Sequence, residues 1–160
     1  MLRNMLVVVV LAAVAVAAVG PERPDFTGTW QFDPSKSSAK TDWFPEQTLV
    51  IRQFGNRMEM DRMAGEAQLS TGAYITDGKS RPLYKTANEE AVITARWQKK
   101  DLVVTVEHMT RGEIADSSMK DVDRWSLIDN GQTLVHMTSD GKKVTFHKVP
   151  ATKNDSGAAH

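Results

Sequence analysis

The chain has 160 residues, no cysteine, and 20 basic against 20 acidic side chains, so its formal net charge is zero. The lack of cysteine excludes disulfides, thiolate metal sites, cysteine nucleophiles and lipid-modified cysteines. A chain without excess positive charge has no general electrostatic attraction for nucleic acid. We therefore expect no nucleic-acid partner.

Residues 1–20 have the pattern of a secretory signal peptide. Arg3 supplies a short positive region, and Met5 to Val19 is an uncharged run of Leu, Val and Ala that ends in small residues. A helix that spans a membrane needs roughly 20 apolar residues, more than this run contains, and a retained anchor is the alternative. We expect a periplasmic or secreted protein with no membrane span once the signal is removed.

The next part of the chain, residues 25–149, is expected to form one domain of short β-strands. The first run, from Phe26 to Phe32, alternates aromatic and polar residues as a strand with one aromatic face does. Further β-prone runs follow at 47–54, 57–63, 70–76, 82–86, 91–98, 101–109, 122–128, 132–139 and 143–149. Asp-Gly or Asn-Gly pairs at 77–78, 130–131 and 140–141 are hairpin signals, because type I′ turns need positive φ.

This pattern predicts an all-β domain, an antiparallel meander of about eight to ten strands that closes into a barrel. Helical periodicity is weak beyond the signal, and we expect only one helical turn, within Thr110 to Lys120. Residues 150–160 are small and polar, so we expect a disordered tail.

Two motifs carry a resemblance to a known family. Phe26-Thr27-Gly28-Thr29-Trp30, followed by Asp33-Pro34-Ser35-Lys36-Ser37, resembles the opening of lipocalin-like (calycin) barrels. It is more closely similar to small exported bacterial proteins without an assigned function, and the Arg-Trp pairs at 96–97 and 124–125 match as well. The resemblance implies a barrel with a cavity open at one end, with Gly28 and Trp30 as a structural motif at the closed end. In lipocalins an arginine near the last strand packs across this Trp, whereas this chain has Lys148 in that strand.

Several residues are candidates for holding a ligand. Trp43 and Phe44 lie in a polar loop, where they either tuck onto the barrel or form a lid over its mouth. His108 and His136 alternate in phase with aliphatic residues and are expected to point inward, where a histidine serves as a core residue or a polar anchor. Arg62 shares a strand face with Met58 and Met60, either as an anchor for an anionic group or as a solvated cation at the rim.

Three functions remain open at this point. The first is an exported binding protein that holds a small apolar or amphipathic ligand, with Trp43-Phe44 as the lid and Arg62, His108 or His136 as the anchor. The second is a soft-metal site for copper at Met58, Met60 and Met63, although methionine also fills gaps in cores. The third is a solid barrel that acts as a structural or interaction module.

Enzyme activity is the less favoured interpretation. The chain has no G-x-S-x-G, H-E-x-x-H, Walker or dinucleotide glycine motif, so no catalytic residue and no cofactor is assigned. Asp121 and Asp123 alternate along a strand, but no partner converges on them in the sequence, and we interpret them as polar strand residues. The oligomeric state stays open.

Overall fold

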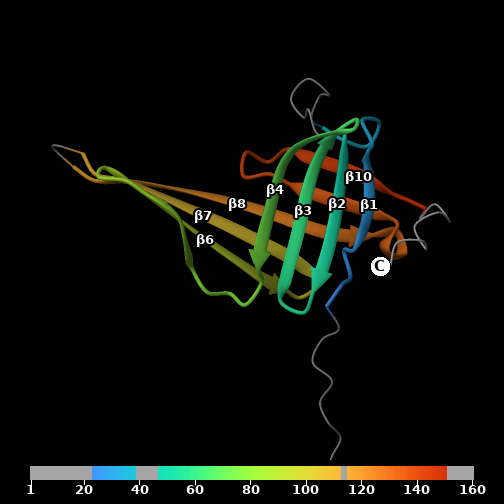
Figure 1. Cartoon of the computed structure of the whole chain (residues 1–160), viewed down its shortest axis with the longest axis horizontal. Helices are drawn as coiled ribbons and strands as arrows, with labels where there is room; N and C mark the ends of the chain where they lie inside the picture. Colours follow the sequence, from blue (N-terminus) through green and yellow to red (C-terminus); the bar gives the residue numbers. More distant parts are fainter. Residues whose placement is uncertain (1–22, 39–46, 113–114, 151–160) are drawn as a thin grey trace, which may run out of the picture.

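The computed structural model describes residues 23–38, 47–112 and 115–150, which form one antiparallel sheet (Figure 1). Its ten strands are β1 (Gly28–Phe32), β2 (Thr48–Phe54), β3 (Arg57–Ala64), β4 (Ala67–Ile75), β5 (Arg81–Lys85), β6 (Glu89–Gln98), β7 (Asp101–Thr110), β8 (Ser117–Ile128), β9 (Thr133–Met137) and β10 (Lys143–Val149). A short 3-10 turn, η2 (Asp129–Gly131), joins β8 to β9. The predicted signal peptide and the predicted tail lie outside the described residues, apart from Pro150.

The all-β meander predicted from the sequence is confirmed, and the predicted helical turn is wrong. β7 continues to Thr110 and β8 already begins at Ser117, because residues 117–121 pair in register with residues 106–110 and so extend the hairpin past the expected boundary. Within the described ranges, no helix is long and apolar enough to cross a membrane.

The sheet has the strand order β4-β3-β2-β1-β10-β9-β8-β7-β6-β5. The first and last strands pair with each other, and β4 and β5 form the two edges. The hairpin predicted at Asp77-Gly78 is therefore wrong. This segment instead reaches β6, where Asp77 bridges Arg96 and the Gly78 amide donates to the Ala95 carbonyl at 3.0 Å. Gly78 has the positive φ of a turn residue, but a turn signal does not specify which strand is the partner.

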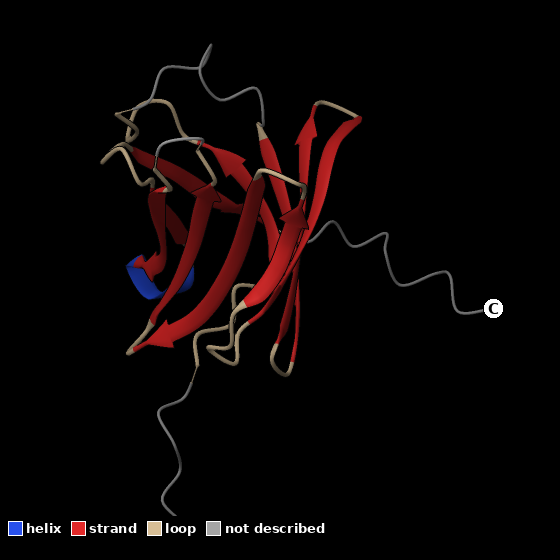
Figure 2. Ribbon diagram, turned by 90° about the vertical axis from the view of Figure 1, so that its left-hand side faces the viewer, coloured by secondary structure: helices blue, strands red, loops and turns tan. Residues whose placement is uncertain are grey.

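One side of the sheet holds the core, and we call it the inner side. Its buried residues come from strands far apart in the sheet order, such as Met60 on β3 and Leu102 on β7, both fully buried. The sheet must curl to bring them together, and Figure 2 shows the strands arranged around a common interior. Alternation along each strand supplies the apolar residues for this interior.

Part of the sheet extends beyond this interior. Figure 1 shows β6, β7 and β8 continuing to the left of the other strands as a narrow projection. We call this projection, residues 81–93, 106–112 and 115–122, the arm. Its inner side is continuous with the inner side of the rest of the sheet, because the β6–β7–β8 register runs unbroken along it.

The Trp of the Gly-x-Trp motif is part of the buried core. Trp30 is fully buried, and its Nε1 donates to the Phe26 carbonyl oxygen at 2.9 Å. Lys148 Nζ lies 5.2 Å from the centroid of the Trp30 ring, within reach of a cation–π contact. Gly28 has φ of +147°, and a Cβ there would lie 2.8 Å from Lys148 Cε. Glycine thus permits the approach of Lys148 to Trp30.

Asp77 anchors the crossing from β4 towards β6. Arg81 Nη1 and Nη2 each donate to a different Asp77 oxygen at 2.8 Å, and the Lys79 amide donates at 3.0 Å. The Arg81 guanidinium, followed by the Lys79 amide, holds the pKa of Asp77 well below its ordinary value of 3.8. The unfolded chain therefore takes up this proton at a higher pH than the folded chain does.

We expect Asp77→Asn to lower the thermal unfolding midpoint at pH 7. A depressed folded pKa contributes stability that is present above the unfolded value of 3.8 and is lost as pH falls through the folded value. The difference from wild type should therefore shrink steadily below about pH 4. Circular dichroism melts at pH 7 and at acidic pH measure it, with Glu66→Gln in the exposed β3–β4 turn as the control. A difference that stays constant down to the most acidic pH would contradict the assignment.

Candidate functional site

The inner side of β8 changes character along its length. Asp121, Asp123, Trp125 and Leu127 alternate onto one side of this strand. Asp123 pairs in register with Val104, and both Val104 and Trp125 belong to the buried core. The two carboxylates therefore lie on the inner side, next to the point where the core ends and the arm begins.

The first polar pair is formed by His136 and Asp123. His136, on β9, pairs in register with Trp125, and the two rings stack with centroids 3.8 Å apart and planes 4° from parallel. His136 Nε2 lies 3.1 Å from Asp123 Oδ2, and the Ser139 amide donates to Asp123 Oδ1 at 3.0 Å. The His136 side chain is 7% exposed and that of Asp123 is 37% exposed. A buried imidazole thus supports a carboxylate that solvent can reach.

The second polar pair lies within the arm, two residues further along β8, and it is formed by His108 and Asp121. His108 Nε2 is 3.6 Å from Asp121 Oδ2, and His108 Nδ1 is 3.3 Å from the Tyr84 hydroxyl. The side chains of His108 and Asp121 are 31% and 40% exposed. Tyr84, His108 and Asp121 come from β5, β7 and β8 of the arm. Ala91 of β6, which pairs in register with both Tyr84 and His108, lies between the first two.

Together the two pairs form a row of polar groups beside apolar residues. Ionised carboxylates only accept hydrogen bonds, whereas imidazole and phenol groups can donate or accept. Val106 on β7 and Ile93 on β6 pair in register with each other and line the same side. In residues 23–38, 47–112 and 115–150, no group of three or more His, Asp or Glu is placed to hold a metal ion. The row offers hydrogen bonding to a bound molecule.

Arg62 lies on a different wall of the interior. It shares the inner side of β3 with Met58 and Met60, and it pairs in register with Leu49 of β2. In the sheet order β3 is separated from β8 by β2, β1, β10 and β9. The structure therefore pairs each predicted histidine with an aspartate of β8, and it places Arg62 on a strand that is not adjacent to them.

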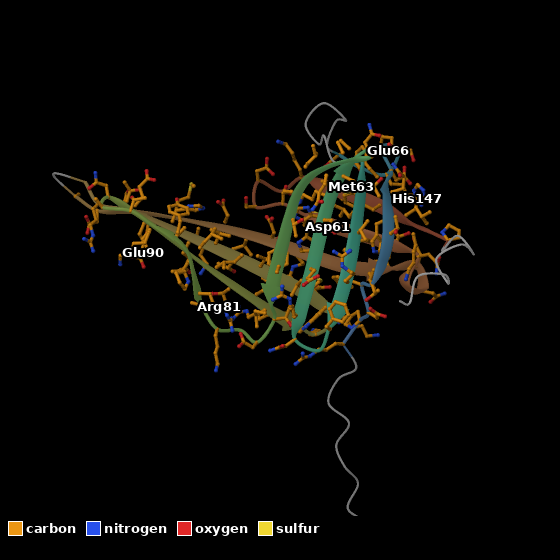
Figure 3. All side chains as sticks on the ribbon, in the orientation of Figure 1. Asp61, Met63, Glu66, Arg81, Glu90 and His147 are labelled. Atoms are coloured by element: carbon orange, nitrogen blue, oxygen red, sulfur yellow. The ribbon has the colours of Figure 1, made fainter. Side chains whose placement is uncertain are left out.

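The three methionines do not share one side of β3. Met58 and Met60 are fully buried in the core, whereas Met63 alternates onto the outer side, near the end of the strand (Figure 3). His147, also labelled in Figure 3, is exposed on β10, as its alternation with buried Val144 and Phe146 predicts. Trp43 and Phe44, the predicted lid, lie outside the described residues.

Three of the pockets in the described part of the chain bear on the site. A space of about 50 Å³ lies between β4 and β6, beside Tyr74, Ile93 and Ala95. A pocket of about 390 Å³ lies at the tip of the arm, next to Lys85, Arg111 and Ser117. One of about 550 Å³ lies beside the β6–β7 and β8–β9 turns, next to Arg23, Lys100 and Asn130. The smallest of them is lined by Ile93, which pairs in register with Val106 beside the polar row.

Sequence reasoning missed Asp121, Asp123, Trp125 and Tyr84. The signal for three of them was available, because Asp121 and Asp123 have the same parity as Trp125 on an alternating strand. This parity predicts an inward position for the two carboxylates, as it does for His108 and His136. Tyr84 carried no usable signal, since the position of β5 on the arm depends on pairing with β6.

No protein-family model and no curated protein matches the chain. The residues of the inner side, the arm and the sequence resemblance are therefore the features that indicate a function.

Proposed function

We propose that this protein binds a small amphipathic molecule on the inner side of its sheet, where the arm begins. The observation that carries the proposal is the change from buried core to a solvent-accessible row of Asp–His pairs on one continuous surface. The apolar part of the ligand contacts Val106 and Ile93. Its polar part is a hydrogen-bond donor, a hydroxyl or ammonium group, directed at Asp121 and Asp123.

Support for this proposal comes from how Asp123 is held. The buried, stacked imidazole of His136 and the Ser139 amide fix both of its oxygens. A group that is already fixed loses little conformational entropy when a ligand binds, so more of the interaction energy contributes to affinity. Arg62 and His108 are the other proposed polar anchors, and Arg62 would suit an anionic group on the ligand.

We also infer that the sheet is an incomplete lipocalin-like barrel in an exported protein. The cation over Trp30 supports the likeness, with Lys148 in the place of the lipocalin arginine. The Asp77–Arg96 bridge supports closure near one end, because it ties the segment after edge strand β4 to β6. We propose a periplasmic or secreted location because residues 1–20 have the pattern of a secretory signal peptide.

Native mass spectrometry of protein purified gently from its own host tests the binding proposal. We expect a retained small-molecule mass, and we expect Asp121→Asn combined with Asp123→Asn to weaken retention at least about tenfold, the loss typical of a hydrogen bond to a charged group. Glu107→Gln, on the outer side of β7, is the matched control and should retain the mass. Unchanged retention in the double variant would refute the site. A bare wild-type mass together with failure to bind an amphipathic fluorescent probe would refute the function.

A structural or interaction module is the second candidate, and the arm favours it. Leu83, Met109, Met119 and Val122 are large apolar side chains of the arm that are 40–61% exposed. Exposed apolar groups of this kind mark interaction sites when they are clustered. A bare polypeptide mass in the experiment above would raise this candidate to first place.

The copper alternative has the weakest support of the three. Met58 and Met60 fill the core and Met63 faces the other side of β3, so one ion could not contact all three in this arrangement. Titration with Cu(I) tests it directly. Binding tighter than about micromolar would restore this alternative.

A further inference from the structure

We propose that two copies of this chain associate through the free edges of their β4 strands, so that two sheets join into one. This inference goes beyond the proposed function and does not depend on it. It begins from the position of β4, which pairs with β3 on one side and is an edge of the sheet on the other (Figure 1). Residues 67–71 of this strand are all exposed.

An edge strand presents unpaired N–H and C=O groups that can pair with another chain. The Asp77–Arg96 bridge lies beyond the end of β4 and so leaves most of this edge open. The only irregularity in the β3–β4 register falls opposite Arg62 and Met63, near the start of β4. From Ser70 to Ile75 the strand is regular. Its last residues, Ala73 to Ile75, lie beside β6 of the same chain across a space of about 50 Å³, so the edge is open mainly from Ala67 to Gly72.

The two edges of the sheet differ in how they are protected. Proteins commonly guard an exposed edge with charged residues, proline or a bulge. β5 has all three, with Arg81 and Lys85, with Pro82, and with a register shift between Pro82 and Tyr84. β4 has the sequence AQLSTGAYI, which contains no charged residue and no proline. Of the two edges, only β4 is left in a form suited to pairing.

A second copy is the partner that this edge fits best. A two-fold axis pairs the β4 edge of one copy antiparallel with the β4 edge of the other, so that backbone donors of one copy face acceptors of the other. A charged side chain on this edge would then lie near a charge of the same sign on the other copy. β4 carries no charge, and the nearby carboxylate of Asp61 on β3 is neutralised by Arg52 Nη2 at 2.6 Å. The formal net charge of the whole chain is zero, so no long-range repulsion opposes the pairing.

The lack of cysteine in the chain makes disulfide mapping of this interface clean. Single variants Ser70→Cys, Thr71→Cys and Ala73→Cys place a thiol at successive points of the edge. Residues opposite one another in an antiparallel pair have Cα atoms about 4.5–5.5 Å apart, within the range that a disulfide spans. We expect one of these variants to form a disulfide-linked dimer on mild oxidation, and that variant locates the two-fold axis. Leu83→Cys, on the β5 edge, is the control and should form no disulfide-linked dimer.

Sedimentation velocity provides the second readout on the unmodified chain. We expect a concentration-dependent dimer, and we expect Ala73→Lys to weaken it at least tenfold because the substitution puts a charge on this edge in both copies. Leu83→Lys is the matched control and should dimerise like wild type. Circular dichroism verifies that each variant is folded, and Thr71→Lys replaces Ala73→Lys if the latter is not. A wild-type chain that stays monomeric at about 200 µM, or a dimer that cross-links through Leu83→Cys and not through β4, would overturn the proposal.

Discussion

Replacing Trp30 with alanine is expected to lower the free energy of unfolding by about 3–5 kcal/mol, the usual cost of truncating a large buried aromatic. Trp30 is fully buried in the core. The substitution removes its packing area, the hydrogen bond to Phe26 and the contact with Lys148 together. Equilibrium unfolding in urea, followed by far-ultraviolet circular dichroism, measures the change.

Two further variants separate these contributions. Trp30→Phe keeps an aromatic ring but loses the indole N–H, and we expect a smaller loss than for alanine. Lys148→Met keeps an apolar stem over the ring and removes the charge, and we expect a loss of about 1 kcal/mol or less. If Trp30→Ala cost less than Lys148→Met, the assignment of Trp30 as a main packing group of the core would be wrong.

Replacing His136 with alanine is expected to lower the free energy of unfolding by about 2–4 kcal/mol, because it leaves a cavity and removes a stacked ring. The His136 ring lies 3.8 Å from the Trp125 ring, and its Nε2 holds Asp123 at 3.1 Å. The same variant should increase the solvent exposure of Trp125. Urea unfolding and the wavelength of tryptophan emission measure the two effects.

His136→Phe and His147→Ala are the controls for this prediction. Phenylalanine keeps the stack on Trp125 and loses the contact with Asp123, whose carboxylate still accepts the Ser139 amide and remains 37% exposed. We therefore expect His136→Phe to cost less than half as much as His136→Ala. His147 is exposed on β10, and its removal should change stability by less than about 0.5 kcal/mol. Equal losses for His136→Ala and His147→Ala would contradict the packing role of His136.

The candidate site was partly predictable from strand alternation. His136 shares the parity of buried Leu134, so its inward position followed from the sequence pattern. The contact of His136 with Asp123 did not, because the register between β8 and β9 determines which residues of the two strands lie opposite each other. Arg62 illustrates the same limit, since its parity predicts the inner side but not its distance from the histidines in the sheet order.

The sequence by itself determined the class of structure. Alternating apolar residues specify strands and their buried sides, and glycine-containing turn signals mark most of the points where the chain reverses. These are local properties, which depend on residues a few positions apart.

Only the tertiary structure decided which strands become edges and where the arm leaves the interior. Asp77-Gly78 reads as a hairpin in the sequence, yet the chain crosses there from β4 to β6 and leaves β4 and β5 unpaired with each other. The physical reason is that every strand edge offers the same backbone donors and acceptors. Which strands pair is therefore determined by how the side chains of the whole interior pack, and it cannot be predicted from the residues of a short segment.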